Sequence, residues 1–182
     1  MLFRSRDVDG LSFLVENILS FNRLDKGRWV ARVEAVRLAD VVASVREELG
    51  DLEARPVEWT VDGVDGIELE VDPELLRLLL QNLCRNACQH NERDPVCLEL
   101  SAREAGARVV VDLSDNGVGV PSGARKHLFT AFWRAPGGRT RGSGLGLAIC
   151  RRVARLHGGR IDLLHTGEDG STFRLELPRA RS

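Results

Sequence analysis

The sequence predicts an α/β fold: a two-layer sandwich in which a mixed sheet packs on about three helices, with an additional N-terminal helical segment. Segments with apolar residues at helical spacing are interleaved with short segments that alternate apolar and polar residues, and each kind can bury its apolar face against the other. The 182 residues are enough for one well-packed domain and a short extra element. We therefore expect a helix with its linker over residues 1–27 and one main domain over residues 28–182.

The N-terminal helix is expected to end near Asp25-Lys26-Gly27, because Gly27 is suited to a C-cap. Its apolar residues lie mostly three or four positions apart and form one stripe: Leu11, Leu14, Val15, Ile18 and Phe21. A single amphipathic helix cannot bury such a stripe against itself. We expect this helix to pack on a partner helix or on another chain.

The next segments predict one helix and short extended elements. Residues Trp29–Val36 are expected to be extended, and Leu38–Leu49 has the apolar spacing of a helix. Two further segments, Val57–Val61 and Ile67–Val71, alternate apolar and polar residues as strands do. They flank Asp62-Gly63, which predicts a hairpin-like turn between them.

The rest of the chain predicts two helices and four strands. Asp72-Pro73-Glu74 is a strong helix start, because the carboxylate can cap the helix and proline is tolerated in the first turn. Gly158-Gly159 ends the last helix. The expected elements are the helix Pro73–His90, strands Val96–Ala102 and Arg108–Leu113 paired around a turn at Gly106, the helix carrying Leu145 to Leu156, and strands Arg160–Leu164 and Thr172–Leu177.

Composition excludes several classes of protein. The 26 basic and 27 acidic residues nearly balance, so bulk charge indicates no nucleic-acid partner. The four cysteines form no C-x-x-C pair, which argues against structural zinc and disulfides and is typical of a reducing cytosol. No apolar run reaches the roughly 18 residues of a membrane span. We expect a soluble, cytoplasmic polypeptide, and a membrane anchor on a longer parent protein stays open.

The helix Pro73–His90 carries polar residues where function is expected. Asn82 and Asn86 lie one turn apart, and Gln89 and His90 gather on the same side. Asparagine is at best a moderate helix former, so two in a helix interior need a reason. Their side-chain oxygens suit Mg²⁺, which takes few protein ligands beside water and phosphate oxygens. Hydrogen bonding to neighbouring backbone is the alternative explanation.

Two glycine-bearing segments have the chemistry of a nucleotide site. In Asp115-Asn116-Gly117-Val118-Gly119 the carboxylate can accept a hydrogen bond from an exocyclic amine, and the glycines allow close backbone approach. An ordinary Asp-Asn-Gly turn is the alternative. The segment Gly142–Leu147 leads into a helix whose first amides can bind phosphate. It lacks the G-K-[ST] ending of a Walker loop and fits the dinucleotide pattern poorly.

Five motifs in order resemble the catalytic and ATP-binding domain of sensor histidine kinases. That domain belongs to an ATPase superfamily that also includes DNA gyrase, the ninety-kilodalton heat-shock chaperone and the MutL proteins. The resemblance runs from about Leu11 to Pro178. The matching segments are Asn82–Ala87 (N box), Asp115–Gly119 (G1 box), Leu128–Arg134 (F box), Gly142–Leu147 (G2 box) and Gly170–Phe173 (closing glycine motif).

The resemblance implies ATP and Mg²⁺ as cofactors and a role for each motif. Asn86 would be the Mg²⁺ ligand, Asn82 would assist at the phosphates, and Asp115 would bind adenine N6. A lid over about residues 121–141 would be hinged by the G2 glycines and mobile without nucleotide. The residues expected to bind the cofactors are Asn82, Asn86, Gln89, His90, Asp115, Gly117, Gly119, Phe132, Arg134, Gly142, Gly144, Leu145, Gly146, Leu147 and Thr172.

Within that set the resemblance implies finer roles. Gly117 and Gly119 would shape the adenine pocket, and Phe132 would anchor the lid. Arg134 could face either the γ-phosphate or the partner domain. Residues 1–27 resemble the C-terminal part of a dimerisation and phosphoacceptor helix.

The chain departs from the family pattern at two places. Gln89 stands where the family often has Lys or Arg, so a phosphate-facing cation is missing. The phosphoacceptor box is absent, because none of the four histidines (His90, His127, His157 and His165) lies on the N-terminal helix. No general base is therefore assigned. His157 is expected to be structural, and His127 and His165 are expected at the surface.

Three functions remain open, in order of preference. The first is a histidine kinase domain that transfers the γ-phosphoryl group of ATP to a histidine outside this chain, for relay to a response regulator. The second is a nucleotide-responsive binding module without transfer activity. The third, an ATP-hydrolysing clamp, is weaker because Asn82 occupies the place of the acidic base that the resemblance implies. The expected partners are a phosphoacceptor domain of the same or a partner chain, a response regulator, and a second copy bound through the N-terminal helix.

Overall fold

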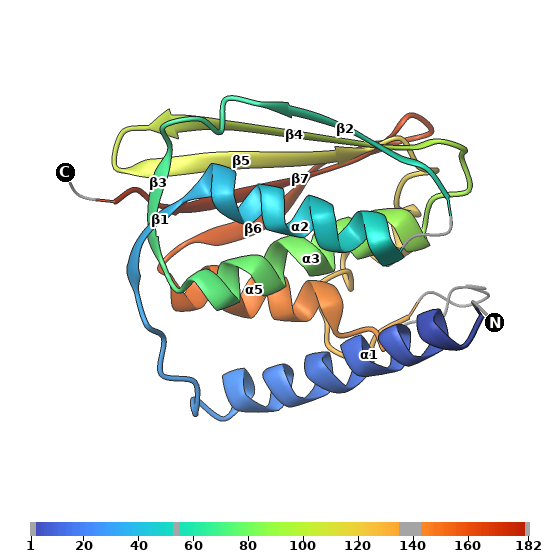
Figure 1. The fold of residues 1–182 in the computed structure, drawn as a ribbon, viewed down its shortest axis with the longest axis horizontal. Coiled ribbons are helices and arrows are strands. Elements are labelled where there is room, and N and C mark those ends of the chain that lie inside the picture. Colours follow the sequence, from blue (N-terminus) through green and yellow to red (C-terminus); the bar gives the residue numbers. More distant parts are fainter. Residues whose placement is uncertain (1–2, 53–54, 135–142, 181–182) are drawn as a thin grey trace.

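The computed structural model describes residues 3–52, 55–134 and 143–180. Helices are interleaved with single strands and pairs of strands along the chain (Figure 1). The elements are α1 Phe3–Asp25, β1 Glu34–Arg37, α2 Leu38–Leu52, β2 Val57–Asp62, β3 Glu68–Val71, α3 Pro73–Gln89, β4 Val96–Ala105, β5 Arg108–Asp115, α4 Ser122–Arg125, α5 Gly146–Leu156, β6 Arg160–Gly167 and β7 Gly170–Pro178.

A five-stranded sheet forms one layer of the molecule, in the order β2-β4-β5-β7-β6. β2 runs parallel to β4, and the other neighbours are antiparallel, so the sheet is mixed. Helices α2, α3 and α5 cover one face of it (Figure 1). The predicted two-layer sandwich is thereby confirmed. α1 lies on the far side of α3 and α5 from the sheet and packs mainly on α5 (Figure 1).

The predicted hairpin-like turn between β2 and β3 is wrong. β3 pairs with β1 in a separate two-stranded sheet, and β2 pairs in parallel with β4. The connecting loop explains the difference, because Val64 and Ile67 are buried in the core and draw the chain away from the edge of β2. Gly63 has a φ of 67° and packs against the carbonyl of Ala102, where a β-carbon would lie only 2.2 Å away. Burial of the loop therefore outweighs local turn chemistry.

Helix α3 begins as predicted, at a capping carboxylate. Oδ1 of Asp72 accepts hydrogen bonds from the amides of Glu74 and Leu75 at 3.0 and 3.1 Å. Oδ2 accepts from the amide of Arg32 at 2.9 Å and from the indole of Trp29 at 3.4 Å. Asp72 thus fixes both the start of α3 and the segment before β1. Regular pairing there begins at Glu34 rather than at Trp29, so the predicted extended segment is longer than the strand.

The two glycine helix ends are also confirmed. Gly27 has a φ of 59°, and the amide of Arg28 reaches back to the carbonyl of Arg23 at 2.9 Å. Gly158 has a φ of 67°, and the amide of Gly159 bonds to the carbonyl of Ala154 at 2.8 Å. Both arrangements have the 6→1 hydrogen bond of a Schellman motif.

The apolar stripe predicted along α1 is divided between two faces. Phe21 is buried against the rest of the chain, and Leu14 is half-buried. Leu11, Val15 and Ile18 are 61%, 48% and 40% exposed. Leu19, which the predicted stripe did not include, lies exposed among them. α1 therefore has one apolar face against the domain and a second that no described residue covers.

Candidate functional site

Three segments that are distant in sequence meet beside helix α3: the end of β5, the segment that begins α5, and Phe132-Trp133-Arg134. A β-carbon added at Gly146 would lie 2.9 Å from Oδ1 of Asn82. Asp115 and Arg134 are both close enough to His90 to affect its protonation. The structure thus brings most of the predicted site residues to one region, at the carboxyl end of α3 and the start of α5.

Asp115 ends β5 on the face of the sheet that the helices cover. Its Oδ1 accepts a hydrogen bond from the amide of Gly117 at 2.8 Å. Burial raises the pKa of the Asp115 carboxyl above its ordinary value of 3.8, against the lowering effect of hydrogen bonds from the amides of Gly117 and Ser171. The carboxylate is half-buried and therefore more sensitive than a surface acid to the loss or gain of a hydrogen-bond donor.

Ser171 rather than Thr172 lies opposite Asp115 in the antiparallel ladder. Thr172 pairs with Ser114, and their hydroxyls are 2.8 Å apart. Because side chains alternate along a strand, Thr172 and Ser114 lie on the other face of the sheet. The structure thus places the predicted Thr172 on the opposite face of the sheet from Asp115, whereas Ser171 lies directly opposite Asp115.

The glycines after Asp115 allow close backbone approach. At Gly117 a β-carbon would lie 2.7 Å from Oδ1 of Asp115, inside the turn that the carboxylate closes. Gly119 has a φ of 76°, and a β-carbon there would lie 2.2 Å from the carbonyl oxygen of Gly167. Thr166 adds a hydrogen bond from the amide of Val120 to its hydroxyl, at 2.6 Å. This segment therefore packs against the turn between β6 and β7.

The polar residues of α3 differ in burial. Asn82 is 3% exposed and is hydrogen-bonded inside the protein, whereas Asn86 is half-buried. Gln89 and His90 are exposed at the end of the helix. Desolvation lowers the pKa of His90, and the nearby Arg134 acts in the same direction while Asp115 opposes it.

The segment before α5 lies against Phe132. Gly144 has a φ of 69°, its carbonyl accepts the amide of Phe132 at 3.0 Å, and a β-carbon there would lie 2.7 Å from the carbonyl oxygen of Trp133. Leu145 and Leu147 are buried in the core, so these two predicted site residues serve packing through their side chains. Gly146 is half-buried beside Asn82. The predicted Gly142 lies outside the described residues, as do residues 135–141 of the predicted lid.

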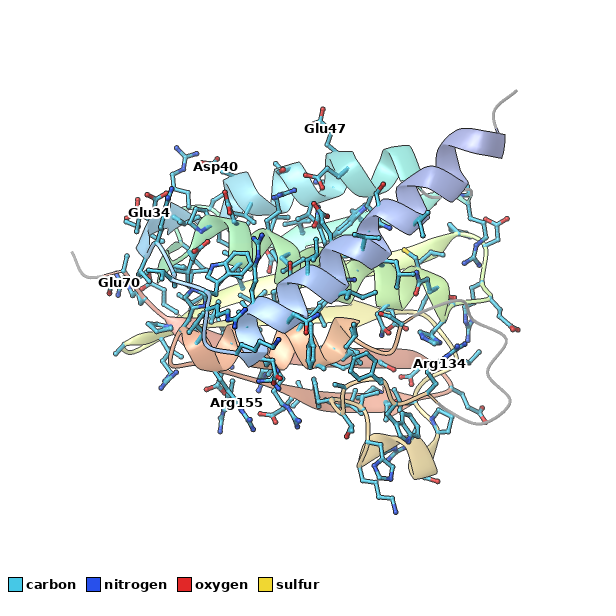
Figure 2. The ribbon with its side chains drawn as sticks, turned by 90° about the horizontal axis from the view of Figure 1, so that it is seen from below. Glu34, Asp40, Glu47, Glu70, Arg134 and Arg155 are labelled. Carbon is cyan, nitrogen blue, oxygen red and sulfur yellow. The ribbon has the colours of Figure 1, made fainter. Side chains whose placement is uncertain are left out.

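Phe132 is the non-glycine residue of the described chain with a positive φ, 63°. The residue is 65% exposed, yet its ring meets the ring of Phe21 edge-to-face, with centroids 5.7 Å apart. Arg134 is exposed and lies toward the end of the molecule away from Glu34 and Glu70 (Figure 2). The predicted lid anchor is therefore in contact with the N-terminal helix.

The other three histidines behave largely as expected. His157 is 7% exposed and hydrogen-bonded at both ring nitrogens, which confirms its structural role. His165 is exposed and lies 3.0 Å from a carboxylate oxygen of Asp169. His127 is half-buried rather than at the surface, because its ring stacks on Trp133 with centroids 5.3 Å apart.

Sequence reasoning assigned no role to three asparagines that organise the site. Asn17 on α1 hydrogen-bonds to Asn82, and both side chains are buried. Nδ2 of the buried Asn91 donates to Oδ1 of Asn116 at 2.6 Å, and Oδ1 of Asn116 also accepts the amide of Cys97 at 2.9 Å. The sequence could have indicated that Asn17 faces the domain, because Asn17 lies four residues before Phe21, on the inner face of an amphipathic helix.

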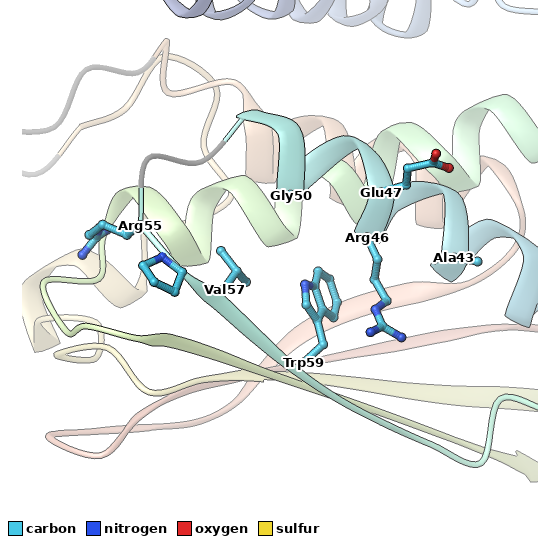
Figure 3. Close-up of a pocket in the computed structure, with 8 residues that line it drawn as sticks. Ala43, Arg46, Glu47, Gly50, Arg55, Val57 and Trp59 are labelled. Atoms are coloured by element: carbon cyan, nitrogen blue, oxygen red, sulfur yellow. The ribbon is translucent and has the colours of Figure 1, made fainter.

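A cavity of about 710 Å³ lies away from these residues. It is bounded by α2 and β2, where the guanidinium of Arg46 lies over the ring of Trp59 (Figure 3). It contains none of the predicted site residues. The predicted site is the better candidate, because the raised pKa of Asp115 and the close glycine contacts gather there.

The described part of the chain contains neither a membrane-spanning helix nor a cluster of three or more His, Cys, Asp or Glu side chains. No helix in it is long and apolar enough to cross a membrane. No three His, Cys, Asp or Glu side chains in it gather as metal ligands would.

Comparison with known proteins gives consistent matches. The family model described as histidine kinase-, DNA gyrase B-, and HSP90-like ATPase (HATPase_c) matches residues 71–181. Sensor histidine kinase MtrB of Mycobacterium leprae (strain TN) is 37% identical over 180 residues, 96% of this chain and 32% of that protein. Signal transduction histidine-protein kinase AfsQ2 of Streptomyces coelicolor (strain ATCC BAA-471 / A3(2) / M145) is 34% identical over 171 residues, 93% of this chain and 31% of that protein.

Solved structures agree with the fold. Full-length ShkA in complex with AMPPNP superposes on this chain with a TM-score of 0.79 at 28% sequence identity. The match covers 96% of this chain and 37% of the ShkA chain. The histidine kinase AdeS of Acinetobacter baumannii has a TM-score of 0.77 at 20% identity, over 96% of this chain and 81% of that one, which shows the shared fold. This chain spans about a third of the length of the curated relatives that it matches.

Proposed function

This chain belongs to the histidine kinase-, DNA gyrase B- and HSP90-like ATPase family, and from this premise we propose that residues 28–182 are the catalytic domain of a sensor histidine kinase. The domain binds Mg-ATP and transfers the γ-phosphoryl group to a histidine outside this chain, for relay to a response regulator. The relatives MtrB and AfsQ2 support this proposal by their names, and ShkA supports it by its complex with AMPPNP.

The observation that carries the proposal is the environment of Asp115. Its carboxylate is half-buried at the end of a central strand, has a raised pKa, and faces the helices beside two glycine turns. Such a carboxylate suits an exocyclic amine like adenine N6, whose N–H groups need an acceptor away from water. Ser171 lies opposite on the same face and can add a hydroxyl contact. We assign the adenine end of the ligand to this pair.

The phosphates fit at the start of α5. This helix is 11 residues long, and its first turn contains Gly146 and has no acidic side chain. The amides of a helix start point at an anion, and the helix dipole favours negative charge there. Asn82 lies beside Gly146 on one side, and Phe132 lies beside Gly144 on the other. These contacts hold the backbone in place for a phosphate.

The residues present also fit Mg²⁺. Asn86 is half-buried one turn beyond Asn82, so its carboxamide oxygen can bind a metal held by phosphates. Mg²⁺ commonly takes one or two protein oxygens and completes its shell with water and phosphate oxygens, which matches a site with few carboxylates. When bound, the ion neutralises charge on the transferring group. Asn86 orients it, and Asp115 orients the base.

We assign residues 1–27 to the end of a dimerisation helix. Leu11, Val15, Ile18 and Leu19 form an exposed apolar face on α1, opposite the face that packs on the domain. A second copy carries the same apolar face, so two copies can bury these residues by pairing their α1 helices. Replacing Ile18 by Glu should therefore shift any dimer of this chain toward monomer in light scattering, and an unchanged mass would contradict this assignment.

Binding of nucleotide is tested with Asn86→Ala. We expect this variant to lose Mg-ATP binding in isothermal titration calorimetry while its circular dichroism spectrum is unchanged. Asn22→Ala is the matched control, because Asn22 is an exposed asparagine on α1 that bonds to its own helix. Mg-ATP binding by Asn86→Ala at the wild-type affinity would overturn the assignment of the metal ligand.

Transfer is tested by mixing this chain with a phosphoacceptor-domain protein from the same genome and γ-labelled ATP. Acid-labile label on the acceptor histidine is the expected result. Tight binding of ATP without label would instead favour a nucleotide-responsive binding module, a reading motivated by the exposed Gln89 and by the absence of a histidine on α1. Steady release of phosphate without an acceptor would favour an ATP-hydrolysing clamp.

A further inference from the structure

A reciprocal pair of hydrogen bonds joins helix α1 to the proposed nucleotide site. Nδ2 of Asn17 donates to Oδ1 of Asn82, and Nδ2 of Asn82 donates to Oδ1 of Asn17, both at 3.1 Å. Each side chain is 3% exposed. Two buried carboxamides are costly unless they are well paired, so this contact is specific in its geometry as well as in its position.

The carbonyl of Leu78 and the side chain of Asn17 together determine which way the amide of Asn82 points. Nδ2 of Asn82 donates to this carbonyl at 2.9 Å. A carbonyl oxygen can only accept, so the nitrogen of Asn82 and not its oxygen must face Leu78. The remaining N–H of Asn82 points to Asn17. Both N–H groups of Asn82 are therefore engaged while α1 is in place.

The group that Asn82 presents to the start of α5 is consequently its carbonyl oxygen. A β-carbon added at Gly146 would lie 2.9 Å from this Oδ1 and 3.7 Å from the Cγ atom, so the oxygen is the nearest atom of the side chain. Oδ1 accepts one hydrogen bond from Asn17 and has a second lone pair unused by the described residues. Asn82 thus offers the site a hydrogen-bond acceptor and no hydrogen-bond donor.

We propose that Asn17 is a specificity-determining residue that makes the site select Mg-ATP over metal-free ATP. The inference rests on the proposed nucleotide site. A carbonyl oxygen repels the oxygens of a bare triphosphate, but it accepts a hydrogen bond from water bound to Mg²⁺. Asn17 keeps this oxygen in place by donating to it and by taking the second N–H of Asn82.

Without Asn17, one N–H of Asn82 would be released. The side chain could then rotate and donate directly to a phosphate oxygen, which would stabilise metal-free ATP and remove the acceptor for metal-bound water. Groups around a metal that orient its ligands and waters change metal affinity by about 10–100-fold. Selectivity for the metal complex therefore depends on a residue of α1 outside the main domain.

The decisive measurement is the ratio of two dissociation constants on the full chain, that for ATP in EDTA divided by that for ATP with excess Mg²⁺. We expect Asn17→Ala to lower this ratio by about 10-fold relative to wild type. Asn17→Leu has a similar size but can neither donate to Oδ1 of Asn82 nor accept its second N–H, and it should lower the ratio as well. Asn22→Ala, an asparagine removed from the outer face of the same helix, should leave the ratio unchanged.

The outcomes separate this inference from a merely structural role. If Asn17 only held α1 against the domain, Asn17→Ala would change both dissociation constants by the same factor or leave both unchanged. An unchanged or higher ratio would therefore overturn the inference. Wild-type chain that binds ATP in neither condition would instead overturn the proposed function and this inference with it. Wild-type selectivity for Mg-ATP together with an unchanged ratio in Asn17→Ala would overturn the inference alone.

Discussion

The backbone amide of Asp72 donates a hydrogen bond to Nε2 of His157, at 2.9 Å, and so joins the start of α3 to the end of α5. Since Nε2 accepts, the imidazole is neutral with its proton on Nδ1, which donates to the carbonyl of Val153 at 2.8 Å. His157 is buried, and it bridges two helices whose opposite ends form the proposed site. The bridge thus helps to set the spacing between Asn82 and the start of α5.

Replacing His157 by Ala should lower the free energy of unfolding by about 1–3 kcal/mol, because the amide of Asp72 is left buried without an acceptor. His157→Gln should recover part of the loss, since its carboxamide oxygen can accept in place of Nε2. Urea denaturation followed by circular dichroism measures both. Equal stabilities for His157→Ala and wild type would show that this hydrogen bond carries no net free energy.

Gly170→Ala should be far more destabilising than Gly106→Ala. Both glycines have positive φ, 129° and 65°. At Gly170 a β-carbon would lie 1.8 Å from the carbonyl oxygen of Asp115, whereas at Gly106 nothing lies within 4 Å. We expect about 1 kcal/mol for Gly106→Ala from backbone strain, and about 3 kcal/mol or more for Gly170→Ala from strain plus overpacking. Thermal denaturation of the pair measures the difference, and similar melting temperatures would contradict the close contact.

Local chemistry was sufficient to predict the helix starts and ends. The carboxylate of Asp72 and the glycines at positions 27 and 158 act on backbone groups a few residues away, so their effect does not depend on the rest of the fold. The close backbone contacts after Asp115 are local for the same reason, because Asp115 and its glycines form one short segment. The relative positions of α3, β5 and α5 follow from the resemblance to a family rather than from any single segment.

Features that depend on contacts between residues distant in sequence could not be predicted. The partner of β2 is β4, which follows it by more than 30 residues, and the loop at Val64 is directed by burial. That Ser171 lies opposite Asp115 depends on the strand register, which alternation within β7 cannot supply. Asn17 was not part of the apolar stripe predicted for α1, and its importance depends on Asn82, 65 residues away.

The four cysteines should differ sharply in reactivity. Burial raises the pKa of the thiols of Cys84 and Cys150, so these groups are protonated and shielded at neutral pH. Cys88 is buried as well, and Cys97 is half-buried. Ellman's reagent should therefore release about one equivalent quickly from native protein and all four in denaturant, and Cys97→Ser should remove the fast phase. A fast equivalent that persists in Cys97→Ser would contradict the buried positions of the other three thiols.

Asp115 should affect stability and nucleotide affinity in opposite directions. The folded pKa lies above 3.8, so the native state binds this proton more tightly than the unfolded state. The stabilisation from this proton is fully present below pH 3.8 and is lost as the pH rises through the folded pKa. At neutral pH the partly buried, ionised carboxylate therefore destabilises the folded state. Asp115→Asn removes that destabilisation and retains an oxygen that can accept the amide of Gly117, so its melting temperature at pH 7 should rise.

Ionisation of Asp115 should strengthen the binding of ATP, although it destabilises the fold, because the ionised carboxylate is the better hydrogen-bond acceptor for adenine N6. Wild-type affinity should fall as pH is lowered through the raised pKa of Asp115, and the affinity of Asp115→Asn should be weaker at pH 7 by about 10-fold or more. The ratio of the two affinities at each pH cancels the titration of the nucleotide itself. This ratio should approach one in acid, where both side chains are neutral, and a ratio independent of pH would exclude Asp115 as the group that binds the base.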